Sequence, residues 1–212
     1  MSIEERKNRE RSMRGQQIQV AAKELFIEKG FNSTTIEDIA KKAELSPATI
    51  YLYFKNKEEL YTSLNLITLQ YLSNKIKKIY DNGKLPIEKK IFKFKDALYT
   101  TFAYDPLMFR NILHVQLEDT LLTISSEMVD KINNMAHEIM KMIAGVYEEG
   151  VRQNKFNKSN STAQADIIWG LFTGIILWEE SKKKLNPKKD FVKSTLDIAF
   201  DIFCRGIKKS KD

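Results

Sequence analysis

Three signals for the start of a helix follow one another closely in the first third of the chain. Thr34 stands three residues before Glu37, which is the pattern of a capping box. Ser46 precedes Pro47, a combination that caps a helix and suits its first turn. Asn56 is a third capping residue, with acidic residues soon after it. The spacing therefore predicts three helices, over residues 35–43, 47–54 and 57–81.

The first two of these helices are only about two turns long, and the link Glu44-Leu45 between them is very short. Helices of this length are unstable alone and must pack on a neighbour. A helix, a tight turn and a second helix form the helix-turn-helix motif. Another helix, over residues 14–29, precedes the motif, carries apolar residues at helical spacing and ends at Gly30. The N-terminal part of the chain is therefore predicted to be a three-helix domain.

The short helix over residues 47–54 has two unlike faces. At 100° per residue, Ile50 and Phe54 point the same way, into the core of the domain. The opposite face carries no acidic residue, several hydroxyl groups and little apolar surface. A surface that meets phosphates and base edges has this composition. The face and the residues that follow it are the first members of the predicted DNA-binding set: Pro47, Ala48, Thr49, Tyr51, Leu52, Tyr53, Lys55 and Lys57.

A run of basic residues precedes the helix over 14–29. It consists of Arg6, Lys7, Arg9, Arg11 and Arg14. Two interpretations stay open: a solvated, frayed start of the helix, or a basic arm that lies on phosphates. The whole chain has 35 Lys and Arg against 28 Asp and Glu, a net charge of +7. That balance permits nucleic acid or an anionic membrane surface as a partner and establishes neither.

Composition favours helices. Eight Gly and four Pro in 212 residues are few, which fits long helices better than a turn-rich β fold. One cysteine cannot form an internal disulfide, so we expect a reducing, cytoplasmic location. The longest uncharged apolar run, residues 167–178, is too short to cross a bilayer, so we expect no membrane partner.

The rest of the chain is also predicted to be helical. The expected helices span residues 87–103, 106–119, 126–153, 162–183 and 188–208. The predicted fold class is therefore all-α, with an N-terminal helix-turn-helix domain of three helices over residues 1–57. A larger helical domain for effector binding and dimerisation follows over residues 58–212.

The N-terminal motif resembles the DNA-binding domain of the TetR (tetracycline-repressor-like) family of transcriptional regulators. The resemblance covers about fifty residues, and later residues match only in size and helical character. It rests on Ala21–Phe26, Gly30, Phe31, Thr34–Ile36, Asp38–Ala40, Ala43, Ser46, Thr49–Tyr51 and Tyr53–Leu60.

The resemblance implies a homodimeric regulator, most often a repressor, that binds a palindromic operator in double-stranded DNA. Each subunit would place one recognition helix, here residues 47–53, in a major groove. An effector in the second domain would move the helix over 57–81 and change the distance between the two recognition helices. The resemblance also implies site roles: Thr35, Tyr51, Tyr53 and Lys57 contact phosphates, and Pro47, Ala48 and Thr49 contact bases.

One departure concerns the operator. The predicted face contains no Arg, Lys, Asn or Gln, the residues that make bidentate contacts to guanine and adenine. Ala48, Thr49 and Leu52 offer methyl and apolar surface, which suits thymine methyl groups. We therefore predict an A·T-rich operator that is recognised partly through its shape.

A second predicted site binds a small-molecule effector. In the family, a cavity often lies among the helices that correspond to residues 87–103, 126–153 and 162–183. Aromatic and methionine side chains would favour an apolar or amphiphilic effector. An ordinary closed core is the alternative. The predicted lining residues are Phe92, Tyr99, Phe102, Met128, Met135, Phe172 and Ile176.

The last two helices are predicted to form the dimer interface. Gly170 and Gly174 lie four residues apart on one face, which lets another helix approach closely. Two such helices from each subunit would make a four-helix interface. The predicted interface residues are Gly170, Gly174, Leu177, Val192, Leu196, Ala199 and Phe203.

Signals of an enzyme are weak. His137 begins the H-E-x-x-H pattern of zinc proteases, but Lys141 occupies the second ligand position. His114 and Glu118 stand one turn apart, and such a pair is more often a surface contact than a metal site. Cys204 lies among apolar residues and is predicted to be a buried apolar side chain. We expect no enzymatic activity, no cofactor and no metal.

One rival function remains. A helical module could bind proteins or anionic membrane surfaces through its basic patches, without sequence-specific DNA binding. It does not explain three capped helices in succession with an exposed face free of acidic residues.

Overall fold

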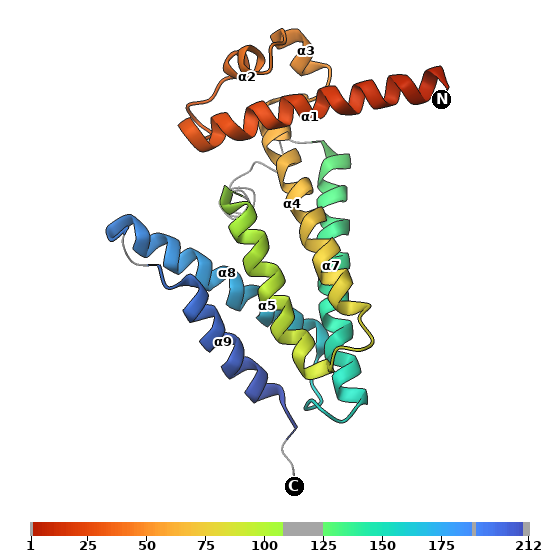
Figure 1. Cartoon of the computed structure of the whole chain (residues 1–212), viewed down its shortest axis with the longest axis vertical. Helices are drawn as coiled ribbons and strands as arrows, with labels where there is room; N and C mark the ends of the chain where they lie inside the picture. Colours follow the sequence, from red (N-terminus) through yellow and green to blue (C-terminus); the bar gives the residue numbers. More distant parts are fainter. Residues whose placement is uncertain (1, 108–124, 188–189, 210–212) are drawn as a thin grey trace. The chain divides into compact units, whose positions relative to one another are not determined.

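The computed structural model describes residues 2–107, 125–187 and 190–209, and these residues are almost entirely helical (Figure 1). The all-α prediction is confirmed. The predicted helix over 106–119 falls for the most part outside the described residues, as does His114. The described helices are α1 (Ile3–Lys29), α2 (Ile36–Lys42), α3 (Pro47–Tyr51), α4 (Lys57–Tyr80), α5 (Ile87–Tyr104), α7 (Ser126–Arg152), α8 (Ser161–Leu185) and α9 (Val192–Ile207).

The described chain divides into two compact units. Unit 1 runs to Thr68 and includes the described residues between Leu107 and Ile132. Unit 2 contains Leu69–Pro106 and the described residues from Asn133 onward. Two of the boundaries, at 68/69 and 132/133, fall inside helices, because α4 and α7 each begin in unit 1 and end in unit 2.

The core of unit 1 joins α1, α2, α3 and the start of α4. Ile50 is fully buried and Phe54 is nearly so, which confirms the predicted inner face of the short helix. Phe26 and Tyr61 make an edge-to-face contact with their ring centres 4.9 Å apart. The apolar side chains at this centre are Ile18, Ala22, Leu25, Phe26, Ile36, Ile39, Ala40, Ile50, Phe54, Leu60, Tyr61 and Leu64.

Helix α1 begins eleven residues earlier than predicted, at Ile3 rather than Arg14. Ser2 and Glu5 form a capping box: the Glu5 N–H donates to the Ser2 hydroxyl at 3.1 Å, and the Ser2 N–H donates to the Glu5 carboxylate at 2.7 Å. The basic run is therefore helical, whereas burial in α1 begins only at Ile18.

The start of α2 also differs from the prediction, by one residue. The capping box is formed by Thr35 and Asp38, not by Thr34 and Glu37. Thr34 is fully buried, and its hydroxyl donates to the carbonyl oxygen of Gly30 at 2.8 Å. Because the Thr34 hydroxyl is engaged in this way, Thr35 is the residue that caps α2.

Unit 2 is built on α5, α8 and α9, with α9 packed against both α5 and α8. Lys95 on α5 is almost fully buried and hydrogen-bonds the carboxylate of Asp197 on α9. Glu179 on α8 is also buried and accepts a hydrogen bond from Thr195 on α9 at 3.1 Å. Each buried charge in these pairs therefore has a partner on a neighbouring helix or turn.

Candidate nucleic-acid interface

Helix α3 is short, and local contacts hold it in place. The Ser46 hydroxyl accepts a hydrogen bond from the Thr49 N–H at 3.1 Å and lies 2.8 Å from the Thr49 hydroxyl. Pro47 occupies the first turn, where its missing N–H costs nothing. Ile50 anchors the helix in the core of unit 1. These contacts fix which residues of α3 face solvent.

The outward face of α3 has the predicted composition. Leu52 is 73% exposed and Tyr51 is 54% exposed. Pro47 and Ala48 are exposed, and Thr49 is half-buried. No acidic residue occurs in the first turn of α3. These five predicted residues are thus at least partly exposed along one short segment of unit 1, and none of them is acidic.

Thr35 is exposed at the N-terminus of α2, but its polar groups are already engaged. Its hydroxyl accepts from the Asp38 N–H at 3.1 Å, and its N–H donates to the Asp38 carboxylate at 3.3 Å. The hydrogen bond from the Thr35 backbone, with Lys29 at 3.5 Å, holds the pKa of the Asp38 carboxyl below its usual value. A phosphate at Thr35 would therefore compete with a charged carboxylate.

Lys57 has an internal role that the sequence did not reveal. Its ammonium donates hydrogen bonds to the carbonyl oxygens of Phe31 and Thr34, both at 2.9 Å. It also lies 4.3 Å from the centre of the Phe31 ring. One of its three N–H groups remains for another acceptor. Lys55, two residues earlier, is exposed.

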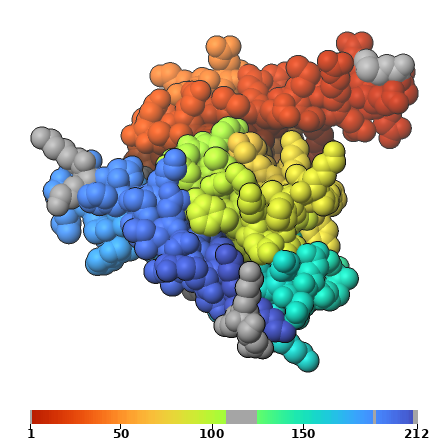
Figure 2. Space-filling view, turned by 60° about the horizontal axis from the view of Figure 1, so that its bottom comes forward, coloured from red at the N-terminus to blue at the C-terminus, as the bar shows by residue number. Residues whose placement is uncertain are grey.

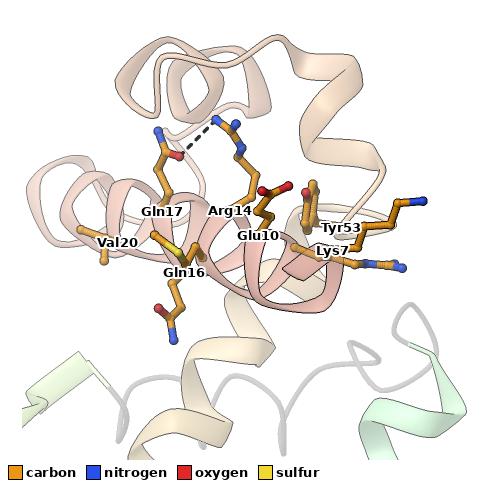
Figure 3. A pocket seen from close by; sticks show the side chains of 9 residues that line it. Lys7, Glu10, Arg14, Gln16, Gln17, Val20 and Tyr53 are labelled. Atoms are coloured by element: carbon orange, nitrogen blue, oxygen red, sulfur yellow. Dashed lines mark hydrogen bonds between the residues drawn. The ribbon is translucent and has the colours of Figure 1, made fainter. Parts of the chain in front are cut away.

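Tyr53 lies where α3 approaches α1. A side-chain carbon at Gly15 would stand 3.7 Å from the Tyr53 ring, an ordinary contact distance. Tyr53 also lines an open hollow of about 810 Å³ along the first turns of α1 (Figure 3). The hollow escaped the sequence analysis because the Ser2–Glu5 box was not recognised as a helix start. Its other lining residues are Lys7, Glu10, Arg11, Met13, Arg14, Gln16, Gln17 and Val20.

The predicted effector-binding residues differ in how far they are buried. Phe172 and Ile176 are fully buried in the core of unit 2, and Phe102 is buried at the end of α5. Phe92, Tyr99 and Met135 are half-buried in the same unit, whereas Met128 belongs to unit 1. A hollow of about 540 Å³ in unit 2 is lined by other residues, among them Tyr147, Val151 and Ser161.

The predicted interface residues fall into two groups. Gly170 and Gly174 are exposed, and a side-chain carbon at either would meet no atom within 4 Å. Leu177, Ala199 and Phe203 are half-buried. Val192 and Leu196 are only 1% exposed, so they hold α9 to its own chain and are out of reach of a second one.

The same two helices expose large apolar side chains that the sequence analysis did not select. They are Ile167, Trp178 and Leu185 on α8, and Ile198 and Ile202 on α9. On α9 the buried and exposed apolar residues form two separate stripes, and the sequence alone does not say which stripe faces the core.

The remaining candidate groups give no sign of a metal site in the described part of the chain. There, no three His, Cys, Asp or Glu side chains gather as metal ligands would. Cys204 is half-buried, and burial raises the pKa of its thiol. None of the described helices is long and apolar enough to cross a membrane.

Comparisons with known proteins agree with the geometry of unit 1. Residues 18–64 match the family described as "Bacterial regulatory proteins, tetR family". The biofilm operon icaADBC HTH-type negative transcriptional regulator IcaR of Staphylococcus aureus is 30% identical over 128 residues, which are 59% of this chain and 64% of that protein. The fatty acid metabolism regulator protein of Bacillus subtilis is 29% identical over 142 residues, 67% of this chain and 70% of that protein.

Solved structures share the whole fold. PfmR of Thermus thermophilus, a TetR family transcriptional regulator, has a TM-score of 0.71 at 21% identity, covering 91% of this chain and 99% of that one. FadR of Bacillus subtilis, solved in complex with stearoyl-CoA, has a TM-score of 0.68 at 22% identity, covering 91% and 98%. The match to the family lies on the three-helix unit that presents α3, and the resemblance noted in the sequence is confirmed. By sequence, residues 18–64 belong to the TetR family of bacterial regulatory proteins, and the described chain shares its fold with solved regulators of that family.

Proposed function

We propose that this chain is a DNA-binding transcriptional regulator, most simply a repressor, that binds a palindromic operator as a homodimer. Residues 1–57 would form the DNA-binding domain, and residues 58–212 the effector-binding and dimerisation domain. The observation that carries the proposal is the outward face of α3, which is exposed, free of acidic residues and fixed by Ile50 in the core. Such a face can enter a major groove without repelling phosphates.

A homodimer would cover the exposed apolar surface of α8 and α9. Trp178 is 64% exposed and Ile198 is 63% exposed, and side chains of this size gain from removal from water. Gly170 and Gly174 leave room on the same face of α8 for a close helix approach. Leu177, Ala199 and Phe203 would line the edge of this contact, whereas Val192 and Leu196 would support it from beneath.

The effector would be a small apolar or amphiphilic molecule held in the second domain. Support comes from the B. subtilis relative, which is named for fatty acid metabolism, and from FadR, which was crystallised with stearoyl-CoA. An acyl chain therefore heads the candidates. Phe92, Tyr99, Phe102, Met135, Phe172 and Ile176 remain the proposed contacts, with Met128 on the part of α7 that belongs to unit 1.

Release from DNA would act through α4. This helix starts beside the DNA-binding residues at Lys57 and continues into unit 2 as far as Tyr80. An effector that favours one position of α4 would shift the population toward one separation of the two α3 helices. Only a separation of roughly 34–36 Å, or a multiple of it, places both helices in major grooves on one face of the operator.

Titration of the protein with fluorescent duplexes from the DNA upstream of its own gene tests the proposal. Fluorescence anisotropy should detect binding that weakens steeply with salt. Tyr51→Phe should weaken all duplexes alike, whereas Leu52→Ala should change the order of preference among them. Ile27→Ala, a change at an exposed residue near the end of α1, is the control. Equal affinity for every duplex in the wild type would contradict sequence-specific regulation.

Adding acyl-coenzyme A compounds to the protein–DNA complex tests the effector. Release of the duplex at micromolar concentration, together with binding of the compound to the protein alone, would support an acyl effector. If no acyl-coenzyme A or other apolar compound released the duplex from the protein, the proposal of an apolar effector would be wrong.

A further inference from the structure

The first turns of α1 do not contribute to the core of unit 1. Every residue from Ser2 to Arg14 is exposed, and the first buried residue of α1 is Ile18. In Figure 1 this part of α1 extends past α3, and in Figure 2 its red surface continues well beyond the orange surface of α2 and α3. Isolated helices of this length are marginal in water, and packing on the core does not explain why the chain carries this one.

Three cations share one side of this extension. At 100° per residue, Lys7, Arg11 and Arg14 lie within about 60° of one another around the helix axis. They span about 10 Å along it, which equals about three phosphates of one DNA strand along the duplex axis. Lys7 and Arg11 form no ion pair with any residue in the described ranges, and Arg14 makes only a long 3.4 Å contact to the Gln17 side chain. We call these three residues the α1 stripe.

The α1 stripe continues the proposed DNA interface. It lines the hollow of about 810 Å³ that also includes Tyr53, one of the predicted phosphate contacts at the end of the recognition segment. Figure 3 shows the Tyr53 ring beside Glu10, on the same side of α1 as Arg14 and Gln17, with Gln16 pointing the opposite way. A DNA strand that touches Tyr53 would therefore have the α1 stripe as its next neighbour.

The stripe is held at a fixed position relative to α3. The Gln17 side-chain amide donates to the carbonyl oxygen of Ala43, at the end of α2, at 2.7 Å. Gln19 donates to the Ser63 hydroxyl on α4 at 2.9 Å. With Ile18 buried between these two contacts, the helix cannot turn about its axis without breaking both. The backbone that carries these charges is therefore ordered before binding, so only the side chains lose conformational freedom on binding.

We infer that the α1 stripe binds the DNA backbone next to the bases under α3, so that Lys7, Arg11 and Arg14 extend the operator contact outward from Tyr53. The inference rests on the proposed function and names a further part of its DNA site. An anionic membrane is the poorer partner, because the extension lacks the apolar face that an interfacial helix buries: Ile3 and Met13 are its only large apolar residues.

The chain provides a matched control for the test. Arg9 is exposed on the same helix but points about 160° away from Lys7, outside the hollow. Arg9→Ala removes the same charge as Arg11→Ala from nearly the same position along the axis. A loss caused by net charge would appear in both variants, and a loss caused by the stripe would appear only in the second.

The experiment measures the affinity of the full chain for two duplexes, one trimmed to a motif selected from random DNA and one extended by flanking base pairs. For Arg11→Ala, the variant matched to Arg9→Ala, we expect about a threefold or greater loss on the extended duplex near 0.15 M salt, and for Lys7→Ala/Arg11→Ala about a tenfold or greater loss. The slope of log K against log salt should fall by about 1 for each cation removed from each subunit. On the trimmed duplex, wild type and variant should bind alike, and Arg9→Ala should match wild type on both.

Several results would overturn the inference. One is a loss of DNA affinity in Arg9→Ala as large as that in Arg11→Ala. Another is a loss of affinity in the stripe variants that is the same on the trimmed and the extended duplex. A third is unchanged DNA affinity in the double variant with lost sedimentation on phosphatidylglycerol vesicles, which would assign the stripe to membranes. If the stripe variants bind DNA as wild type does while Leu52→Ala changes the preference among duplexes, the inference fails and the proposed function stands. If wild type prefers no duplex, the proposed function fails first.

Discussion

The ammonium of Lys57 donates a hydrogen bond to the backbone carbonyl of Phe31 and at the same time lies 4.3 Å from the centre of the ring of that residue. The loop before α2 is therefore attached to the start of α4 by one side chain. Lys57 is a positioning residue for the three-helix unit in addition to any contact it makes with a phosphate.

Replacing Lys57 with alanine should lower stability as well as DNA affinity. Loss of two hydrogen bonds from a charged, half-buried donor should cost about 1–2 kcal/mol in the free energy of unfolding. Urea denaturation measures this loss, and Lys55→Ala, at an exposed neighbour, should leave the free energy of unfolding unchanged. If Lys57→Ala weakens DNA binding but leaves the free energy of unfolding unchanged, Lys57 does not position the three-helix unit and acts only through its contact with phosphate.

The operator should be rich in A·T pairs. Leu52 and Ala48 on the outward face of α3 can contact thymine methyl groups but cannot make bidentate hydrogen bonds to guanine. Selection from random DNA should yield half-sites with A·T pairs beneath α3. Leu52→Ala should relax the preference at one position, by about 1 kcal/mol. Recovery of invariant G·C pairs at the centre of each half-site would contradict this assignment.

The dimer should depend on exposed residues of α9 and not on its buried ones. Ile198→Glu places a charge on a surface that we propose a second chain covers, and light scattering should then report monomers at micromolar concentration. Leu196→Ala should keep the dimer but lower the free energy of unfolding by about 2–5 kcal/mol, because it leaves a cavity in the core. A dimer that survives Ile198→Glu would place the interface elsewhere.

Unit 2 should lose stability in acid through the Lys95 cluster. Burial alone would lower the pKa of Lys95, but hydrogen bonds to Asp197 and Asp96 outweigh it and raise that pKa, so the ammonium stays charged. Burial likewise opposes ionisation of Asp96, yet Lys95 and Lys93 hold the pKa of its carboxyl below the usual value.

The direction of the pH effect follows from the lowered pKa of Asp96. Its stabilising contribution is complete above the unfolded value of about 3.9 and disappears as the pH falls through the lower, folded value. Urea midpoints should therefore fall below about pH 4. Asp197→Ala should cost about 2 kcal/mol at neutral pH, since it leaves a buried ammonium with one partner fewer, and Lys95→Met should cost less. If Asp197→Ala and Lys95→Met lowered the free energy of unfolding equally, the cost would not come from an unpaired ammonium of Lys95.

Local signals predicted the recognition segment well. Ser46 and Asn56 cap α3 and α4 as expected, because a capping hydrogen bond joins residues only three apart. Burial of Ile50 and Phe54 followed from helical periodicity alone. The features that decide whether α3 can face DNA are thus encoded within a few turns of sequence.

Other features depended on the tertiary structure. Thr34 and Thr35 each have an acidic residue three positions later, and only the burial of Thr34 decides between them. On α9, Leu196 and Ile198 are equally apolar, and only packing against α5 and α8 assigns one to the core and the other to the surface. The extension of α1 was missed because residues 3–14 lack the apolar spacing that helix prediction relies on.

The continuity of α4 across the boundary at Thr68 and Leu69 has a consequence for chimeric regulators. Suppose that the corresponding part of a relative is grafted onto residues 1–68 at that point. The angular phase of the helix is then nearly preserved when seven or eleven residues are added or removed, because either number turns the helix by about 20°. A single inserted residue turns everything beyond the junction by about 100°. Fusions that differ by one residue at the junction should therefore differ sharply in whether an inducer is still transmitted.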